Sequence, residues 1–300
     1  MKALRQAIFK TLIYADLFDY PLKVEEVFQQ LIVGDRRLSP RLVTVVEELA
    51  KMKRAKIVFG HKNYFALRSA KKLVDQRTKR SGLANSKRKK AKQVARLLGK
   101  ITFVKLIGLT GSVAFNNAKV KDDIDLLIVT TPKRLWLTRL LIVVILEVWG
   151  KRRRPANLKN KNNQDKICLN LFLSQDNLAL PKQRRNLFTA HELGQMEVLI
   201  QKGNTHAHFL KANLWVKKYL PNVFPPHRRM VALKKVKPIE GWAFFNWLER
   251  VVFWLQLVYM RKRRKNEAVG PNFAFFHPKD MSKKILADYG RKLEKCLCYS

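Results

Sequence analysis

The feature that most constrains the fold is the segment 106–129, in which two apolar stretches flank a short polar link. It reads LIGLTGSVAFNNAKVKDDIDLLIV. Gly111 and Ser112 end the first stretch, and Asp123 and Asp125 open the second. Short apolar runs bounded by turn residues are typical of buried strands. The segment therefore predicts two strands of one sheet, joined by a turn and a short helix that begins near residue 113.

The polar residues of this segment have a chemistry that follows from their spacing. Asp123 and Asp125 stand two apart, so on a strand both carboxylates project from one face. Two such carboxylates repel each other unless a cation lies between them, and oxygen ligands suit Mg²⁺. Gly111 lets the backbone approach a phosphate closely, and the amides of a following helix favour an anion. The sequence thus predicts a corner for metal and phosphate.

This run resembles the signature of the nucleotidyltransferase superfamily of the DNA polymerase β type. That signature is a hydrophobic strand, Gly, Gly or Ser, a gap, and then Asp, a hydrophobic residue, and Asp or Glu. Gly111, Ser112, Asp123 and Asp125 match it position by position. The resemblance implies that the two aspartates hold two Mg²⁺ ions, or Mn²⁺, and that Gly111 and Ser112 bind nucleotide phosphates. Arg139, on the next predicted helix, is a further phosphate-binding candidate, with packing or surface roles as the alternatives.

The resemblance also implies an activity, the transfer of a nucleoside monophosphate from a nucleoside triphosphate to RNA, protein or a small molecule. The superfamily usually places a third carboxylate on a later strand. Here that strand is predicted at 167–173, and its polar residue is Asn170, which cannot act as a base. Asp165, Asp176 or Glu147 are possible substitutes. The alternatives are a catalytically degenerate fold that binds nucleic acid or regulates, and a toxin–antitoxin-type transferase that modifies protein or tRNA.

Around this corner, the chain is expected to be an α+β protein in four parts. They are a winged-helix-like domain, a basic connecting helix, a nucleotidyltransferase domain with a mixed sheet, and a helical C-terminal region, at 1–68, 69–100, 101–180 and 181–300. From residue 181 onward the pattern is helical and broken by prolines. This arrangement resembles that of uncharacterised bacterial nucleotidyltransferase-domain proteins.

The winged-helix expectation comes from the order of elements at the N-terminus. Three helices and a β-hairpin are predicted, at 2–15, 24–32, 39–53 and 55–67. Ser39 is the expected N-cap of the third helix, with Pro40 at its first position. The third helix reads DNA in such folds, but Glu47 and Glu48 argue against a strong reader here. A structural or interaction role is the alternative.

Charge points to polyanionic partners. The chain has 62 Lys plus Arg against 22 Asp plus Glu, a formal net charge of +40. Such a surface attracts nucleic acid through counterion release. The basic segments 77–100 and 151–166 are the expected contacts for RNA or DNA, and a merely solvated basic face is the alternative.

Composition also limits the compartment and the membrane relation. Three cysteines, Cys168, Cys296 and Cys298, form no disulfide framework or zinc motif, which indicates a reducing, cytoplasmic setting. No signal peptide is expected. The apolar stretches 135–149 and 242–260 contain charges and predict buried or amphipathic helices, with no transmembrane segment. The basic run 261–265 after the second stretch could dock on anionic lipid.

Three weaker motifs have plain structural interpretations. His191 and Glu192 form the first two positions of a possible HExxH metalloprotease motif on a predicted helix. The second histidine of that motif is absent, so a buried polar contact is expected. Tryptophans at 242, 247 and 254 have helical spacing, which is more typical of a core than of a stacking platform. Residues 273–278, FAFFHP, are expected to form a packed loop.

Overall fold

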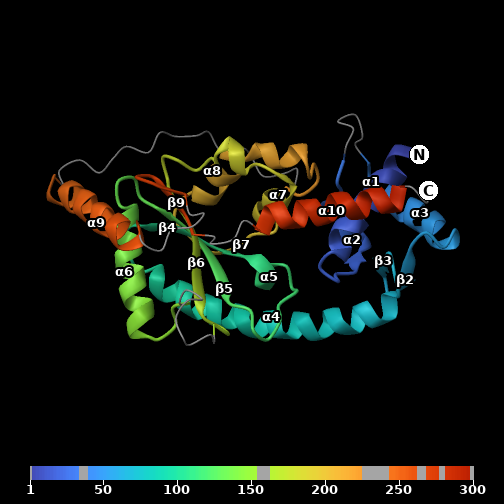
Figure 1. Cartoon of the computed structure of the whole chain (residues 1–300), viewed down its shortest axis with the longest axis horizontal. Helices are drawn as coiled ribbons and strands as arrows, with labels where there is room; N and C mark the ends of the chain where they lie inside the picture. The colour runs from blue at the N-terminus through green and yellow to red at the C-terminus, as the bar shows by residue number, and fades with distance from the viewer. Residues whose placement is uncertain are drawn as a thin grey trace.

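The computed structural model describes residues 2–33, 40–153, 163–224, 243–261, 268–276 and 281–297. The protein is a mixed α+β structure with a three-stranded and a six-stranded sheet, which confirms the predicted fold class at that level. The small sheet and its helices lie at one end and the large sheet at the other, and the helices α4 (Ala70–Leu98) and α10 (Met281–Leu297) extend between the two ends (Figure 1).

The N-terminal unit contains the predicted helices and hairpin, with altered bounds. Its elements are α1 (Lys2–Asp16), β1 (Leu22–Lys23), α2 (Val24–Gln29), α3 (Leu42–Arg54), β2 (Phe59–His61) and β3 (Tyr64–Ala66). Strand β3 pairs with both β1 and β2, and a fully buried apolar cluster joins the three helices. Helix α3 has Arg41 as its N-cap, so the prediction of Pro40 at the first helical position is wrong. Ser39 lies outside the described residues.

Helix α4 connects the two ends and is basic, as predicted, but much of its charge is used inside the protein. Arg77 bonds Glu26 at 2.6 Å, and Lys87 bonds Asp165 at 2.7 Å. These two basic side chains are only 7% and 3% exposed. The expectation of a solvated basic face therefore holds for part of the helix only, because several of its cations pair with acids and carbonyls of the two units it joins.

The large sheet has the strand order β7-β4-β5-β6-β9-β8. Its central strands are β4 (Val104–Thr110), β5 (Ile124–Thr130) and β6 (Ile167–Ser174), and the four-residue helix α5 (Gly111–Ala114) follows β4 directly. Strand β5 is antiparallel to β4 and parallel to β6. Helix α6 (Leu135–Val148) makes the crossover between the parallel strands, since such a pair cannot be joined by a hairpin.

A β-bulge at Asn170 changes which side chains of β6 share a face. Asp125 is opposite Cys168 and Leu126 is opposite Leu169, but Leu127 is opposite Leu171, so Asn170 is the extra residue. Phe172 therefore does not share a face with Cys168 and Asn170. Phe172 packs in the core on the other face, because the bulge reverses the alternation beyond it.

Different helices cover the two faces of the large sheet. Helices α4, α6 and α9 (Ala243–Arg261) pack on the face that carries Ile124, Leu126 and Ile128. The opposite face, which carries Leu127 and Val129, is covered by α1, α10, α7 (Leu187–Gly194), α8 (Thr205–Ala212) and the short 3₁₀ helices Lys182–Arg184 and Leu214–Lys218. Asp125 alternates with Leu126 along β5 and belongs to this second face.

The C-terminal part is not only helical, which corrects the expectation for residues 181–300. Three strands of the large sheet come from it: β7 (Glu197–Gln201), β8 (Ala268–Gly270) and β9 (Phe273–Phe275). Strand β7 pairs with β4, and β9 pairs with β6, so the predicted packed loop at 273–278 is a strand where it is described. Strands of three to five residues are too short to show a period of two and form because neighbouring strands supply their hydrogen-bond partners.

Helix α9 corrects a second expectation. Trp247 and Trp254 are 59% and 63% exposed, so the predicted tryptophan stripe is not a core on this part of the chain, and residue 242 lies outside the described residues. The buried side of α9 contains Val252 and Met260 together with the polar residues Glu249 and Gln256. Among the described helices, none has the length together with the apolar character that crossing a membrane requires.

Candidate metal and phosphate corner

Gly111 lies at the junction of β4 and α5 and is required there by its surroundings. Its φ of +68° lies in the left-handed region, which L side chains rarely adopt. A Cβ atom at this position would lie 2.3 Å from Oδ2 of Asp125. The glycine therefore lets the aspartate of the adjacent strand lie against the backbone turn. Gly111 and Asp125, which the sequence predicts to lie at one site, are in direct contact.

Ser112 and the aspartates occupy neighbouring but different positions. Its hydroxyl donates to Oδ2 of Asp122 at 2.7 Å, and the backbone N–H of Lys119 donates to the same oxygen at 2.9 Å. Asp122, which sequence reasoning did not single out, thus fastens the turn that leads into β5. The described hydrogen bond of Ser112 stabilises this turn, and phosphate binding by Ser112 stays a prediction.

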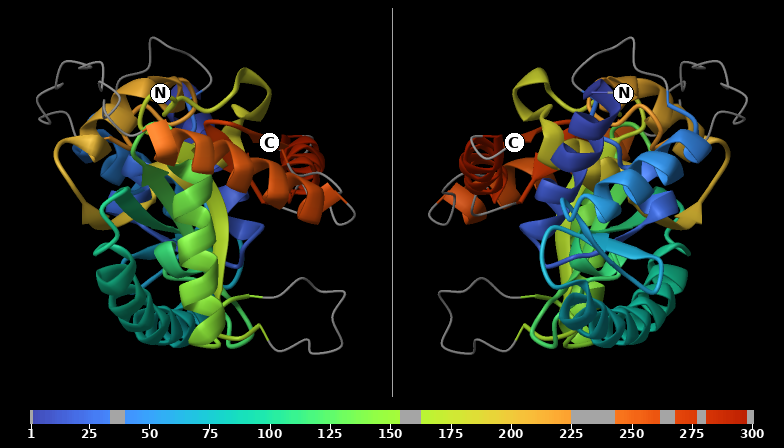
Figure 2. Two further views of the ribbon diagram at one scale, coloured as in Figure 1. Left: turned by 90° about the vertical axis from the view of Figure 1, so that its left-hand side faces the viewer. Right: turned by 90° about the vertical axis from the view of Figure 1, so that its right-hand side faces the viewer.

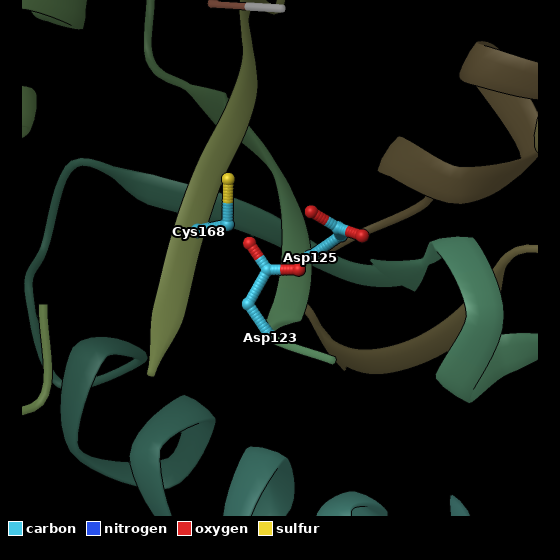
Figure 3. A group of neighbouring side chains, drawn as sticks. All are labelled: Asp123, Asp125 and Cys168. Carbon is cyan, nitrogen blue, oxygen red and sulfur yellow. The ribbon is translucent and has the colours of Figure 1, made fainter. Parts of the chain in front are cut away.

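Asp123, Asp125 and Cys168 form a cluster of metal-binding side chains. One ligand atom from each lies within 4.8 Å of the others. Figure 3 shows the Asp123 carboxylate directed between the Cys168 thiol and Asp125. Asp123 immediately precedes β5, Asp125 is its second residue, and Cys168 lies opposite Asp125 on β6. The predicted pairing of the two aspartates is present, and the cysteine is an addition that the sequence pattern did not reveal.

The two carboxylates are held close together at an electrostatic cost. Burial, and then the nearby charge of Asp123, raise the pKa of Asp125 to about 7. Hydrogen bonds from Cys168 and Asn170 and the charge of Arg153 oppose this rise. A carboxyl with such a pKa is partly protonated at neutral pH unless a cation neutralises the pair. The site therefore favours a bound positive charge.

Arg153 supplies one positive charge to the cluster. Its Nε lies 2.8 Å from Oδ2 of Asp123, and its Nη1 contacts the Cys168 sulfur at 3.1 Å. The approach to Asp123 brings the charges together without hydrogen-bond geometry, so Oδ2 is buried with no donor among the described residues. The distance shows an ion pair, although the contact is not a hydrogen bond to this oxygen. Arg153 thus offsets the charge of Asp123 without saturating it.

Asn170, the candidate for the third position, points into the cluster. Its side-chain amide donates to Oδ1 of Asp125 at 2.5 Å, while its carbonyl oxygen accepts from the Cys168 thiol at 2.9 Å. Strand alternation explains this direction, because Asn170 is two residues from Cys168 and lies on the same face. The alternative substitutes are engaged or remote: Asp165 binds Lys87 and Lys90, and Asp176 is exposed.

Glu192, on helix α7, is the acid that sequence reasoning missed. Burial, followed by the charge of Asp125, raises its pKa to about 8, and the backbone N–H of Gly111 opposes the rise by hydrogen bonding. The carboxyl therefore faces both Asp125 and the glycine turn. The HE pair at 191–192 was the available signal, but it was compared with a metalloprotease pattern that does not apply here.

His191, the neighbour of Glu192, has the structural role that the sequence predicted. It is 2% exposed and stacks on Tyr14 of α1, with ring centroids 4.1 Å apart and ring planes 8° apart. Burial lowers the pKa of His191 to about 3, so the ring is neutral. The stack joins α7 to the N-terminal unit.

Arg139, the further phosphate-binding candidate, lies away from the two aspartates. Its guanidinium donates to the side chain of Gln256 on α9 and lies over the ring of Phe276, 4.3 Å from the ring centroid. Helix α6 packs on the face of the sheet opposite to Asp125. These contacts assign Arg139 to the packing of α6 against α9, one of the two alternatives that the sequence left open.

Two basic residues of helix α4 hold the segment that connects α5 to β5. Arg88 donates to the backbone oxygen of Val113 in α5 and to the side chain of Asn116, at 3.0 and 2.7 Å. Lys87 donates to the backbone oxygens of Val120 and Asp122. Both cations therefore hold the segment between α5 and β5, the segment that sets the separation of Gly111 from the aspartates. This positioning depends on contacts distant in sequence and was not predicted.

The donor set fits a hard divalent cation held by the two aspartates. Carboxylate oxygens are the ligands that Mg²⁺ and Mn²⁺ prefer, and Oδ2 of Asp123 is a buried oxygen without a donor in the described part of the chain. Cys168 fits less well, because burial raises the pKa of its thiol far above the usual range and keeps it protonated. A protonated thiol that bonds Asn170 is a weaker candidate ligand for such a cation than the two carboxylates.

Comparison of the chain with known protein families, with curated proteins and with solved structures gives no match. The function of this protein therefore has to be inferred from the chemistry of the corner itself.

Proposed function

We propose that the protein is a magnesium-dependent nucleotidyltransferase that transfers a nucleoside monophosphate from a nucleoside triphosphate to an acceptor. The observation that carries this proposal is the contact of Gly111 with Asp125 beside Asp123. A tight turn that receives a carboxylate, next to a second carboxylate with an unsatisfied oxygen, is a site for a cation that in turn binds phosphate.

The surrounding sheet supports this proposal. The antiparallel β4–β5 pair, the short α5 between them and the parallel β6 are the arrangement that we infer for a polymerase-β-like domain. The helices and hairpin of the N-terminal unit are the parts from which we infer a winged-helix-like domain. Both assignments rest on the order and pairing of elements together with the motif.

In the proposed reaction, a divalent cation bound by Asp123 and Asp125 supplies charge neutralisation for the nucleotide phosphates. The acceptor hydroxyl attacks the α-phosphorus, the bond to pyrophosphate breaks, and the hydroxyl proton leaves. We assign that proton to Glu192, because Asn170 cannot accept it and Glu192 faces Asp125. A pKa of about 8 suits a general base that operates near neutral pH.

A second candidate is a degenerate fold that binds a ligand or nucleic acid without catalysis. The observation in its favour is Arg153, whose guanidinium already contributes a positive charge to Asp123 and contacts Cys168. Nucleic acid would be bound through the basic segments predicted from sequence. The segment 77–100 has half-exposed cations such as Lys90 and Lys92 in addition to its buried ones. Of the segment 151–166, residues 154–162 lie outside the described residues.

One experiment separates the two candidates. The protein is incubated with each α-³²P-labelled nucleoside triphosphate, Mg²⁺ and, in turn, total RNA, a protein lysate or small metabolites. The proposal predicts label in one acceptor fraction, lost in Asp123→Asn and strongly reduced in Glu192→Gln. Label in no fraction, with nucleotide binding intact, would contradict the transferase proposal and favour the degenerate fold.

A further inference from the structure

Helix α9 carries apolar side chains on both its inner and its outer side, and its inner side buries Val252 and Met260 together with two polar residues. Its buried positions include Glu249 and Gln256, which are 7% and 8% exposed. Its most exposed apolar residues, at 50 to 64%, are Phe244, Trp247, Trp254, Leu255 and Val258. Positions three, four, seven and eight apart lie on one face of a helix, so these side chains form a single outer stripe.

The polar residues on the inner side explain why the helix keeps this orientation. The Glu249 carboxylate accepts from the backbone N–H groups of Trp136 and Leu137 at 2.7 and 2.9 Å. The Gln256 amide donates to the backbone oxygen of Trp136 at 2.9 Å. Rotating the helix to bury its outer stripe would break these bonds. The apolar stripe is therefore fixed outward and is not a misplaced core.

The stripe belongs to a larger apolar end of the molecule. Helix α6, which packs against α9, also exposes apolar residues, with Val144 at 52% and Val148 at 81%. The left-hand view of Figure 2 shows α9 crossing α6 at the end of the molecule that faces the viewer. Exposed apolar surface on this scale marks a binding site for an apolar partner.

The positive charge of α9 and of the whole chain indicates which partner this surface could bind. The exposed residues of α9 include Arg250 and Arg261 and no acid, because its one acid, Glu249, is buried. A second copy of a chain with a net charge of +40 would be repelled. Aromatic and aliphatic side chains with basic residues at the edge match the boundary between the acyl chains and headgroups of an anionic bilayer.

We propose that the outer face of α9 is a docking surface for an anionic lipid bilayer, bound in the plane of the membrane. The tryptophans enter the interface, and Arg250 and Arg261 meet the lipid phosphates. The surface lies on elements that cover the sheet face opposite to Asp125, so docking leaves the metal corner accessible. The further basic residues 262–265, which the sequence suggested for lipid contact, lie outside the described residues and are not needed for this assignment.

The test uses the full chain and vesicles of phosphatidylcholine with or without 30% phosphatidylglycerol. Sedimentation should show binding to the anionic vesicles, with a blue shift of tryptophan fluorescence. Trp247→Gln/Trp254→Gln should weaken this binding roughly tenfold or more, because the lost apolar burial is large. Arg250→Gln/Arg261→Gln should weaken it less and reduce its salt sensitivity.

The matched control is Val43→Ser/Val46→Ser on α3, which removes exposed apolar side chains from the other end of the molecule. This variant should bind the vesicles as wild type does.

Three results would overturn the proposal. One is equal binding of wild type and Trp247→Gln/Trp254→Gln to the anionic vesicles, or no binding by either. Another is a wild-type dimer in sedimentation equilibrium that the tryptophan variant converts to a monomer, which would assign the surface to a second copy. The last is a loss of RNA affinity in that variant without loss of vesicle binding, which would assign the aromatics to base stacking. Circular dichroism of each variant verifies that the fold is retained.

Discussion

A buried carboxylate and a pair of partly buried carboxylates in this protein have opposite surroundings. Glu249, between α9 and α6, accepts hydrogen bonds from the N–H groups of Trp136 and Leu137 in the first turn of α6. Asp123 and Asp125 face each other instead, and an oxygen of Asp123 is buried without a donor in the described part of the chain. The first carboxylate stabilises a helix end, while the two aspartates repel each other, and the charge of Asp123 helps to raise the pKa of Asp125.

The comparison teaches how to separate a structural acid from a functional one. Burial raises the pKa of Glu249, but backbone N–H groups and Arg134 oppose that rise. Burial also raises the pKa of Asp125, and there the next largest influence is another acid, Asp123. An acid whose main neighbours are donors belongs to the scaffold. An acid whose main neighbour is another acid is a candidate for ligand binding.

The largest expected effect is the loss of the structural carboxylate. Glu249→Ala leaves two buried backbone N–H groups without acceptors and should destabilise the protein by about 3 kcal/mol, because each unsatisfied donor loses its hydration. Urea unfolding monitored by tryptophan fluorescence measures the change. Glu249→Gln, which keeps one acceptor oxygen, should cost less. A loss below about 1 kcal/mol for the alanine variant would show that water satisfies these groups.

A smaller loss is expected at the glycine of the functional corner. Gly111→Ala should destabilise the protein by about 2 kcal/mol, since the side chain is strained at a positive φ and its Cβ would displace Asp125. Gly203→Ala is the matched control, because Gly203 has a φ of +61° and no atom near its virtual Cβ. It should cost about 1 kcal/mol, the backbone part alone. Equal losses in the two variants would mean that the contact with Asp125 has no energetic weight.

Sequence and structure agree best where the pattern is local. Gly111, Asp123 and Asp125 were found from sequence because a turn and a strand encode their geometry within a few residues. Glu192 and Arg153 were not, because α7 and the edge of β6 reach the corner only through tertiary packing. The bulge was hidden as well, since Leu169, Asn170 and Leu171 keep an apolar–polar–apolar pattern whichever way the strand is bent.

Helix α9 shows the same limit on a larger scale. The helical spacing of Trp247 and Trp254 correctly predicts that they share a face, but spacing does not say whether that face meets the core or solvent. Strands β8 and β9 were missed for a related reason. Three residues hold no periodicity of their own, and the pairing of β9 with β6 and of β8 with β9 decides their conformation.

The smallest change in stability, with the opposite sign, is expected at the functional acid. Asp125→Asn removes the repulsion from Asp123, so it should stabilise the metal-free protein by about 1 kcal/mol at pH 8. Asp165→Asn is the contrasting variant. The pKa of Asp165 is lowered by hydrogen bonds from Lys87 and Lys90, so its loss should destabilise the protein. Stabilisation by both variants, or by neither, would remove the distinction between paired and clustered acids.

The same contrast predicts a pH dependence. In the folded protein the pKa of Asp125 is about 7 and that of Glu192 about 8, above the unfolded values near 4. Between about pH 4 and 8 the folded state holds protons that the unfolded state has released, so these groups favour folding less as pH rises. The fall in Tm from pH 5.5 to 8 should shrink in Asp125→Asn/Glu192→Gln. An unchanged slope in that variant would contradict the assigned shifts.

The central claim is that Asp123 and Asp125 bind a divalent cation that in turn holds a nucleotide. Calorimetry of nucleoside triphosphate binding, with Mg²⁺ or Mn²⁺ and with EDTA, tests it most directly. The account predicts metal-dependent nucleotide binding in wild type and loss of that binding in Asp123→Asn/Asp125→Asn. It also predicts tighter metal binding in Asn170→Asp, because residue 170 contacts Asp125 and would add a third carboxylate to the pair. Equal nucleotide affinity in wild type and the double variant, with and without metal, would contradict it.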